Sequence, residues 1–117
     1  MPYKRILQDL LGKIGGAIGA GFVASDGETV QLEGRLDDFT HRLHLAYQGI
    51  LLQALNSIHE NPKAKLQTIV TIHQNHTIAI KPPTDGYFLV LTLERGKNLH
   101  RVLRCLEQAA EELNREL

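Results

Sequence analysis

The sequence lacks tryptophan altogether and contains a single cysteine, Cys105. One thiol cannot form a disulfide within the chain, so an intrachain disulfide is excluded. No apolar run approaches the roughly 20 residues that span a bilayer. The N-terminal segment MPYKRILQDL also lacks the apolar core and the small-residue cleavage site of a signal peptide. These absences predict a cytoplasmic protein that does not insert into a membrane.

The sequence also lacks an excess of charge of either sign. Thirteen basic residues balance thirteen acidic ones, and the formal net charge is zero. A general nucleic-acid binder normally carries a basic field that neutralises phosphates, so we expect no nucleic-acid partner. The chain has 117 residues, of which 43% are hydrophobic, and this is enough material for one core. We therefore expect residues 1–117 to form a single domain.

Residues 36–59 carry the most informative pattern, because they read as one long helix with two apolar faces. One face is a broad stripe that suits a core. Nearly opposite, Leu45 and Leu52 stand seven residues apart and Leu55 accompanies them, which is typical of a helix seam. A domain this small cannot bury both faces, so we expect the second face to meet another molecule, with a second copy of the chain as the favoured partner. The alternative is that these are isolated surface leucines, which are common.

Hydrophobic periodicity predicts further elements on either side of this helix. Residues 3–14 have the spacing of an amphipathic helix. Asp26-Gly27 has the chemistry of a tight hairpin turn between two strands. Residues 66–81 alternate around a turn at Gln74-Asn75, which indicates two more strands. Residues 87–93 are apolar on both faces and predict the central strand of the sheet.

A final helix is predicted to begin after Asn98, which is a good N-cap residue. Its apolar side chains fall on one stripe, and Cys105 is expected to point away from it. The predicted order is helix, strand, strand, helix, strand, strand, strand, helix. The stripe comprises Leu99, Val102, Leu103, Leu106, Ala109, Ala110, Leu113 and Leu117.

One glycine pattern invites a cofactor hypothesis. Gly19, Gly21 and Ala24 match the G-x-G-x-x-G/A spacing of a dinucleotide site. That fingerprint must follow a strand and open a helix, whereas here a helix precedes it and a hairpin follows. We interpret the segment as a glycine-rich strand that a helix approaches closely. We expect no cofactor.

Histidines invite a metal hypothesis, and they occur as two close pairs, His41 with His44 and His73 with His76. A zinc site needs a third and a fourth ligand, and neither Cys-x-x-Cys nor His-Glu-x-x-His spacing occurs. Neither Ser25 nor Ser57 has a G-x-S-x-G context. We therefore expect no metal, no catalytic residues and no enzymatic activity, with a metal-dependent enzyme built on the histidines as a minor hypothesis.

The element order and several local patterns resemble the roadblock/LC7 family, which includes dynein light chains, a bacterial gliding protein that partners a Ras-like GTPase, and lysosomal scaffold subunits. The segment 16–24 after the opening helix carries the resemblance, together with Ser25-Asp26-Gly27 in the first hairpin. Strand 87–93 followed by residues 98–103 also matches. The resemblance implies a profilin-like α/β/α sandwich, an α+β arrangement around a five-stranded antiparallel sheet. It further implies a homodimer in which the long helices pack together and the strand before Gln74-Asn75 pairs with its copy.

Members of the family commonly act as platforms or regulators for small Ras-like GTPases, and the resemblance implies that role without any catalytic residue. The leading hypothesis is therefore a non-enzymatic homodimeric scaffold or regulator that binds such a GTPase or other scaffold proteins. A small-molecule-sensing signalling module of profilin-like or PAS-like shape is the alternative. The residues expected at the dimer interface are Leu45, Gln48, Leu52, Leu55, Ile69 and Thr71.

Overall fold

The structure is a computed structural model that describes residues 2–24, 29–35, 68–81, 87–94, 96 and 98–116. Within these ranges the chain is an α+β fold with five strands between two helices in sequence. The predicted helix over residues 36–59 lies outside the described residues. The elements are α1 (Pro2–Lys13), β1 (Ala17–Ala24), β2 (Thr29–Gly34), β3 (Ile69–Ile72), β4 (His76–Lys81), β5 (Tyr87–Glu94) and α3 (Leu99–Glu116).

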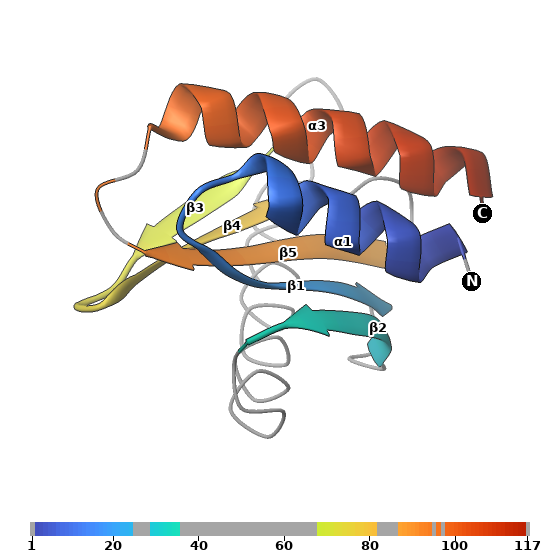
Figure 1. Cartoon of the computed structure of the whole chain (residues 1–117), viewed down its shortest axis with the longest axis horizontal. Coiled ribbons are helices and arrows are strands. Elements are labelled where there is room, and N and C mark those ends of the chain that lie inside the picture. The colour runs from blue at the N-terminus through green and yellow to red at the C-terminus, as the bar shows by residue number, and fades with distance from the viewer. Residues whose placement is uncertain are drawn as a thin grey trace, which may run out of the picture.

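The five strands form one antiparallel sheet in the order β2-β1-β5-β4-β3 (Figure 1). Strand β5 occupies the centre, which confirms the prediction from its doubly apolar sequence. Strands β3 and β4 are joined across Gln74 and Asn75, as their alternation predicted. The expected Asp26-Gly27 turn lies outside the described residues, although the β1–β2 pairing that it was expected to join is present.

Helices α1 and α3 lie side by side on one face of the sheet (Figure 1). They run antiparallel, because contacts join each end of α1 to the opposite end of α3. The Tyr3 hydroxyl donates to the Glu116 carbonyl over 3.3 Å, and the Arg101 guanidinium donates to the Lys13 carbonyl over the same distance. Apolar side chains fill the space between helices and sheet, and the most completely buried include Leu7, Leu10, Phe22, Leu89, Leu91, Leu93, Leu106 and Leu113.

The opposite face of the sheet is also apolar. Because successive side chains of a strand point to opposite faces, Phe88 and Val90 face away from the helices while Leu89 and Leu91 face toward them. A second buried cluster results, with Leu32 and Ile69 packed at its margin. The described residues place no helix on this face, and the long helix predicted over residues 36–59 lies outside them. The second cluster comprises Val23, Ile78, Ile80, Phe88 and Val90.

Two local features fix how the elements begin and meet. The Asn98 side-chain oxygen accepts from the backbone N–H groups of His100 and Arg101 at 3.0 and 3.4 Å, so the predicted N-cap is confirmed. Gly34 ends β2 with φ of 137°, a conformation that favours glycine. A Cβ at Gly34 would overlap the Cα of Gly19 and the carbonyl oxygen of Ile18. The close approach found at this glycine-rich strand is therefore made by a neighbouring strand.

Candidate protein-binding surface

Strand β3 is an edge strand in the described sheet, where β4 is its one neighbour. In an antiparallel pair, residues that bond to the neighbouring strand alternate with residues whose backbone groups point away. The His73 N–H donates to the His76 carbonyl over 2.8 Å, which sets the phase of this alternation. Given the register, Thr71 bonds toward β4, while Val70 and Ile72 direct their N–H and C=O groups to the outer edge. This edge has the geometry to accept another strand.

The sequence of β3 does not guard this edge. Natural sheets protect exposed edges with proline, lysine, inward-pointing charge or bulges. Strand β3 reads Ile-Val-Thr-Ile and contains none of these residues, and its pairing with β4 is regular. An unguarded apolar edge of this kind favours strand-to-strand association.

The side chains of β3 lie on both faces of the sheet. Ile69 is partly buried against the second cluster, and Val70 is partly buried against the core beneath the helices. Ile72 lies on the same face as Val70 but is 63% exposed, the highest value among the large hydrophobic residues in the described ranges. The alternation of residues 66–81 did not say which side of the strand is buried, so the exposure of Ile72 is a feature that sequence reasoning missed.

Two further exposed leucines lie on α3. Leu99 and Leu103 are 37% and 36% exposed, so their assignment to the buried stripe was wrong. At 100° per residue both lie on the opposite side of α3 from Arg101, which contacts α1. Since α1 packs over β1 and β2 while α3 packs over β4 and β5, this side of α3 is turned toward the β3 edge. Within the described ranges, the exposed large apolar residues on this side of the helix layer are Ile72, Leu99 and Leu103, which we call the apolar strip.

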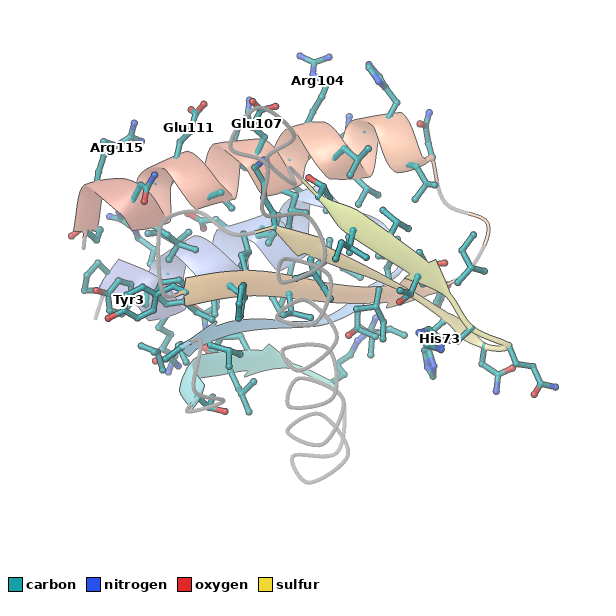
Figure 2. The ribbon with its side chains drawn as sticks, turned by 180° about the vertical axis from the view of Figure 1, so that it is seen from behind. Tyr3, His73, Arg104, Glu107, Glu111 and Arg115 are labelled. Carbon is teal, nitrogen blue, oxygen red and sulfur yellow. The ribbon has the colours of Figure 1, made fainter. Side chains whose placement is uncertain are left out.

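The predicted interface residues are only partly described. Ile69 and Thr71 lie two residues apart on the same face of β3, the face opposite the helices. The Thr71 Oγ1 lies 2.9 Å from Nε2 of the exposed His73 (Figure 2). Leu45, Gln48, Leu52 and Leu55 lie outside the described residues, so their proposed role stays a prediction.

The structure also shows where the candidate metal ligands and the cysteine lie, as far as they are among the described residues. His73 and His76 flank the β3–β4 turn, whereas His41 and His44 lie outside the described residues. No group of three or more metal-ligating side chains occurs within the described ranges. Cys105 is half-buried and packs against the core beneath the helices, so the expectation that it points away from the apolar stripe was wrong. A helical wheel placed it beyond the stripe, but α1 extends the apolar surface on that side.

The glycine pattern lies inside β1, which pairs with β2 on one side and with β5 on the other. Gly19 and Gly21 are both paired strand residues, and β2 is the next described element. The strand-to-helix turn that cradles a pyrophosphate is therefore not what this segment forms. No helix in the part of the chain that the structure describes is long and apolar enough to cross a membrane.

Comparison with solved structures identifies the fold. The chain superposes on a roadblock/LC7 domain from Streptomyces avermitilis with a TM-score of 0.83 and 13% sequence identity, covering 96% of this chain and 94% of that one. It superposes on MglB from Myxococcus xanthus with a TM-score of 0.84 and 12% identity, covering 97% and 93%. A third match is an MglB in a tetrameric arrangement, with a TM-score of 0.77, 22% identity, and 97% and 88% coverage.

No protein-family model matches the sequence, and no curated protein sequence matches it. At these low identities the structural matches establish the fold, which is that of roadblock/LC7 domains. The resemblance read from the sequence is thereby confirmed at the level of fold.

Proposed function

We propose that residues 1–117 form a single roadblock/LC7-like domain that acts as a non-enzymatic homodimeric regulatory module and binds a small Ras-like GTPase in the cytoplasm. The unguarded outer edge of β3 is the observation that carries the homodimer. The likeness to MglB, one example of which has a tetrameric arrangement, supports self-association. The proposed binding to a GTPase rests on the roadblock/LC7 resemblance, since members of that family commonly act as platforms or regulators for such GTPases.

The geometry of β3 restricts how two copies can pair. An antiparallel pairing across a two-fold axis at Thr71 sets Val70 of one copy opposite Ile72 of the other, so that the outward backbone groups of both residues are satisfied. The same pairing brings the apolar strips of the two copies toward one another on the helix side. The proposed interface also includes the residues predicted from the sequence, namely Leu45, Gln48, Leu52, Leu55, Ile69 and Thr71.

Self-association is tested by charging the β3 edge. Ile72→Lys should leave the monomer folded, because this side chain is 63% exposed in the single chain. It should raise the dimer dissociation constant at least about tenfold, since two lysines would be desolvated beside the two-fold axis. Sedimentation equilibrium measures this constant.

Val30→Lys is the matched control, because Val30 is 37% exposed and lies on β2 at the opposite edge of the described sheet. It makes the same substitution, and it should leave the dissociation constant within about twofold of wild type. Equal effects of the two substitutions, or a fully dimeric Ile72→Lys variant, would contradict pairing through β3.

GTPase binding is tested with purified Ras-like GTPases from the same cells, loaded with GDP or with a non-hydrolysable GTP analogue. We expect saturable binding that favours one nucleotide state, measured by biolayer interferometry. The free protein should show no GTP hydrolysis of its own. Absence of binding in both nucleotide states would contradict the GTPase part of the proposal and leave the homodimer standing.

The alternative function, a small-molecule sensor, requires a pocket between the sheet and its covering helices. On the described helix side that space is filled, since Leu7, Leu10, Leu89, Leu91 and Leu106 are at most 1% exposed. A thermal-shift screen of nucleotides and metabolites separates the two functions. A ligand-dependent rise in melting temperature would favour the sensor.

A further inference from the structure

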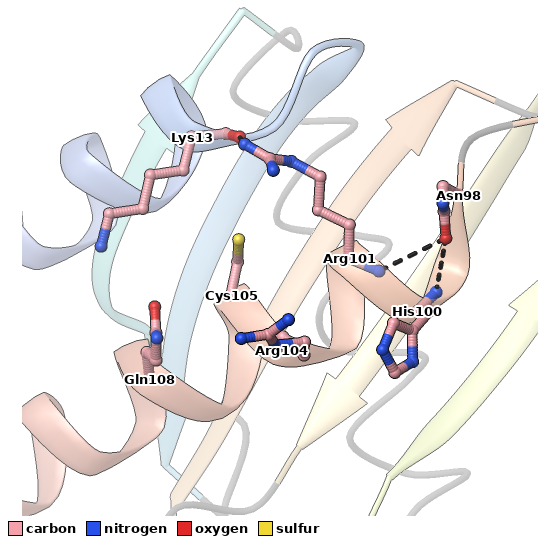
Figure 3. Close-up of a pocket in the computed structure, with 7 residues that line it drawn as sticks. All are labelled: Lys13, Asn98, His100, Arg101, Arg104, Cys105 and Gln108. Carbon is pink, nitrogen blue, oxygen red and sulfur yellow. Dashed lines mark hydrogen bonds between the residues drawn. The ribbon is translucent and has the colours of Figure 1, made fainter.

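A groove of about 460 Å³ lies between the C-terminal end of α1 and the N-terminal half of α3 (Figure 3). Three of its lining side chains are cationic, namely Lys13, Arg101 and Arg104. Asn98, His100 and Gln108 add polar groups, and the half-buried Cys105 is the least exposed residue of the lining. Among the described residues, no carboxylate lines the groove. It is therefore a basic surface in a protein whose net charge is zero.

The N-terminal half of α3 departs from the usual charge preference of a helix, whereas Arg115 in the last turn follows it. A helix N-terminus carries a partial positive charge and favours acidic side chains, whereas the C-terminus favours basic ones. The first turn of α3 contains no acidic residue, and Arg101 and Arg104 stand in its first two turns. Glu107 lies at the middle of the helix, and Glu111, Glu112 and Glu116 follow in the C-terminal half. Figure 2 shows Arg104, Glu107 and Glu111 along the outer side of the helix.

Such an arrangement needs a compensating gain, because positions that violate a local rule are concentrated at functional sites. Arg101 is held over the groove by the bond from its guanidinium to the Lys13 carbonyl, which uses one of the five guanidinium N–H groups. Among the described residues, no ion pair neutralises Lys13, Arg101 or Arg104. An anion in the groove would gain from all three cations and from the positive end of α3 at once.

We propose that this basic groove, lined by Lys13, Arg101 and Arg104, binds an acidic segment of a partner protein, a short run of aspartate or glutamate residues. Carboxylates suit the two guanidinium groups, which can bind them through paired hydrogen bonds. The described lining of the groove contains no Phe, Tyr or Trp to stack on a nucleobase, and the zero net charge of the chain disfavours a long polyanion such as a nucleic acid. The groove lies on the helix face, so this binding is separate from pairing through the β3 edge.

The test uses the full chain and a fluorescein-labelled oligoglutamate peptide, with binding followed by fluorescence anisotropy at low ionic strength. Wild type should bind the peptide, and added salt should weaken the complex. Arg104→Glu should weaken binding about tenfold, because it replaces an attraction with a repulsion at the groove. Lys13→Glu should weaken binding to a similar extent. Arg101 stays unchanged, because its bond to the Lys13 carbonyl also joins the two helices.

Arg115→Glu is the matched control, because it makes the same charge change near the other end of α3 and outside the groove lining. It should weaken binding less than about twofold. Equal weakening by Arg104→Glu and Arg115→Glu would mean that only net charge matters and would overturn the proposal. So would a wild-type protein that fails to bind the peptide, or one that binds inorganic phosphate alone. Sedimentation of the same samples reports the β3 pairing separately.

Discussion

Single atoms decide the packing at two positions of the sheet. At Gly34 the backbone of β1 occupies the place where a side chain would begin, so the register of β1 and β2 depends on the missing Cβ. At Thr92 the reverse holds, because a hydroxyl sits where an apolar group would fit. Thr92 is fully buried, and its Oγ1 has no hydrogen-bond partner among the described residues. Small substitutions at both positions should therefore change the free energy of unfolding.

Gly34→Ala should lower the free energy of unfolding by at least about 2 kcal/mol, because the added Cβ overlaps backbone atoms and the φ of 137° is strained for alanine. Gly12→Ala is the control, since a Cβ there meets nothing within 4 Å and Gly12 lies inside α1. It should raise the free energy of unfolding by about 0.5–1 kcal/mol. Urea denaturation measures both values. A Gly34→Ala variant as stable as wild type would show that the two strands can move apart freely.

Thr92→Val should raise the free energy of unfolding by about 1 kcal/mol, because valine has nearly the same shape and removes a buried hydroxyl without a partner. Thr92→Ser keeps the hydroxyl and removes a buried methyl group, so it should lower the same quantity by about 1 kcal/mol. Thermal and urea unfolding of the three proteins give the order Val, Thr, Ser. A less stable Thr92→Val variant would mean that the hydroxyl makes a valuable hydrogen bond.

At the scale of elements, periodicity identified all seven described helices and strands, because each must bury one or both faces. The doubly apolar residues 87–93 could be placed at the sheet centre for that reason. Periodicity predicts the direction in which a side chain points, but it does not show whether a neighbouring element covers that side chain. Leu99 and Leu103 were predicted to belong to the buried stripe of α3, yet they are exposed, and so is Ile72 on the four-residue edge strand β3. Their exposure depends on tertiary packing, which the periodicity of the sequence does not report.

The groove between α1 and α3 could also be predicted only in part from the sequence. Arg101 and Arg104 are visible in the sequence as basic residues in the first turns of a helix, which already departs from the usual charge preference. Their partner Lys13 lies 88 positions from Arg101 in the chain and comes beside it through the antiparallel packing of the two helices. A site made from two such separate ends requires the three-dimensional arrangement.

At the scale of the whole molecule, the fold is that of roadblock/LC7 domains, and β3 lies at an open edge of the described sheet. The fold could be predicted through the resemblance to the roadblock/LC7 family, which rests on the order of elements and on the residues around the first hairpin. The identity of a partner could not, since it depends on exposed side chains that no core requirement selects. The sequence nevertheless pointed to Ile69 and Thr71 on the edge strand, beside the outward-facing groups of Val70 and Ile72.

The central claim is that the outer edge of β3 is covered by a second copy of the chain. Hydrogen exchange at the backbone amides of Val70 and Ile72 tests it most directly, because both N–H groups point away from β4. Measured by NMR across a concentration series, both amides should exchange slowly in the dimer and rapidly on dilution to the monomer of 13.1 kDa. Fast exchange of both amides in a stable dimer would contradict the account and place the interface elsewhere.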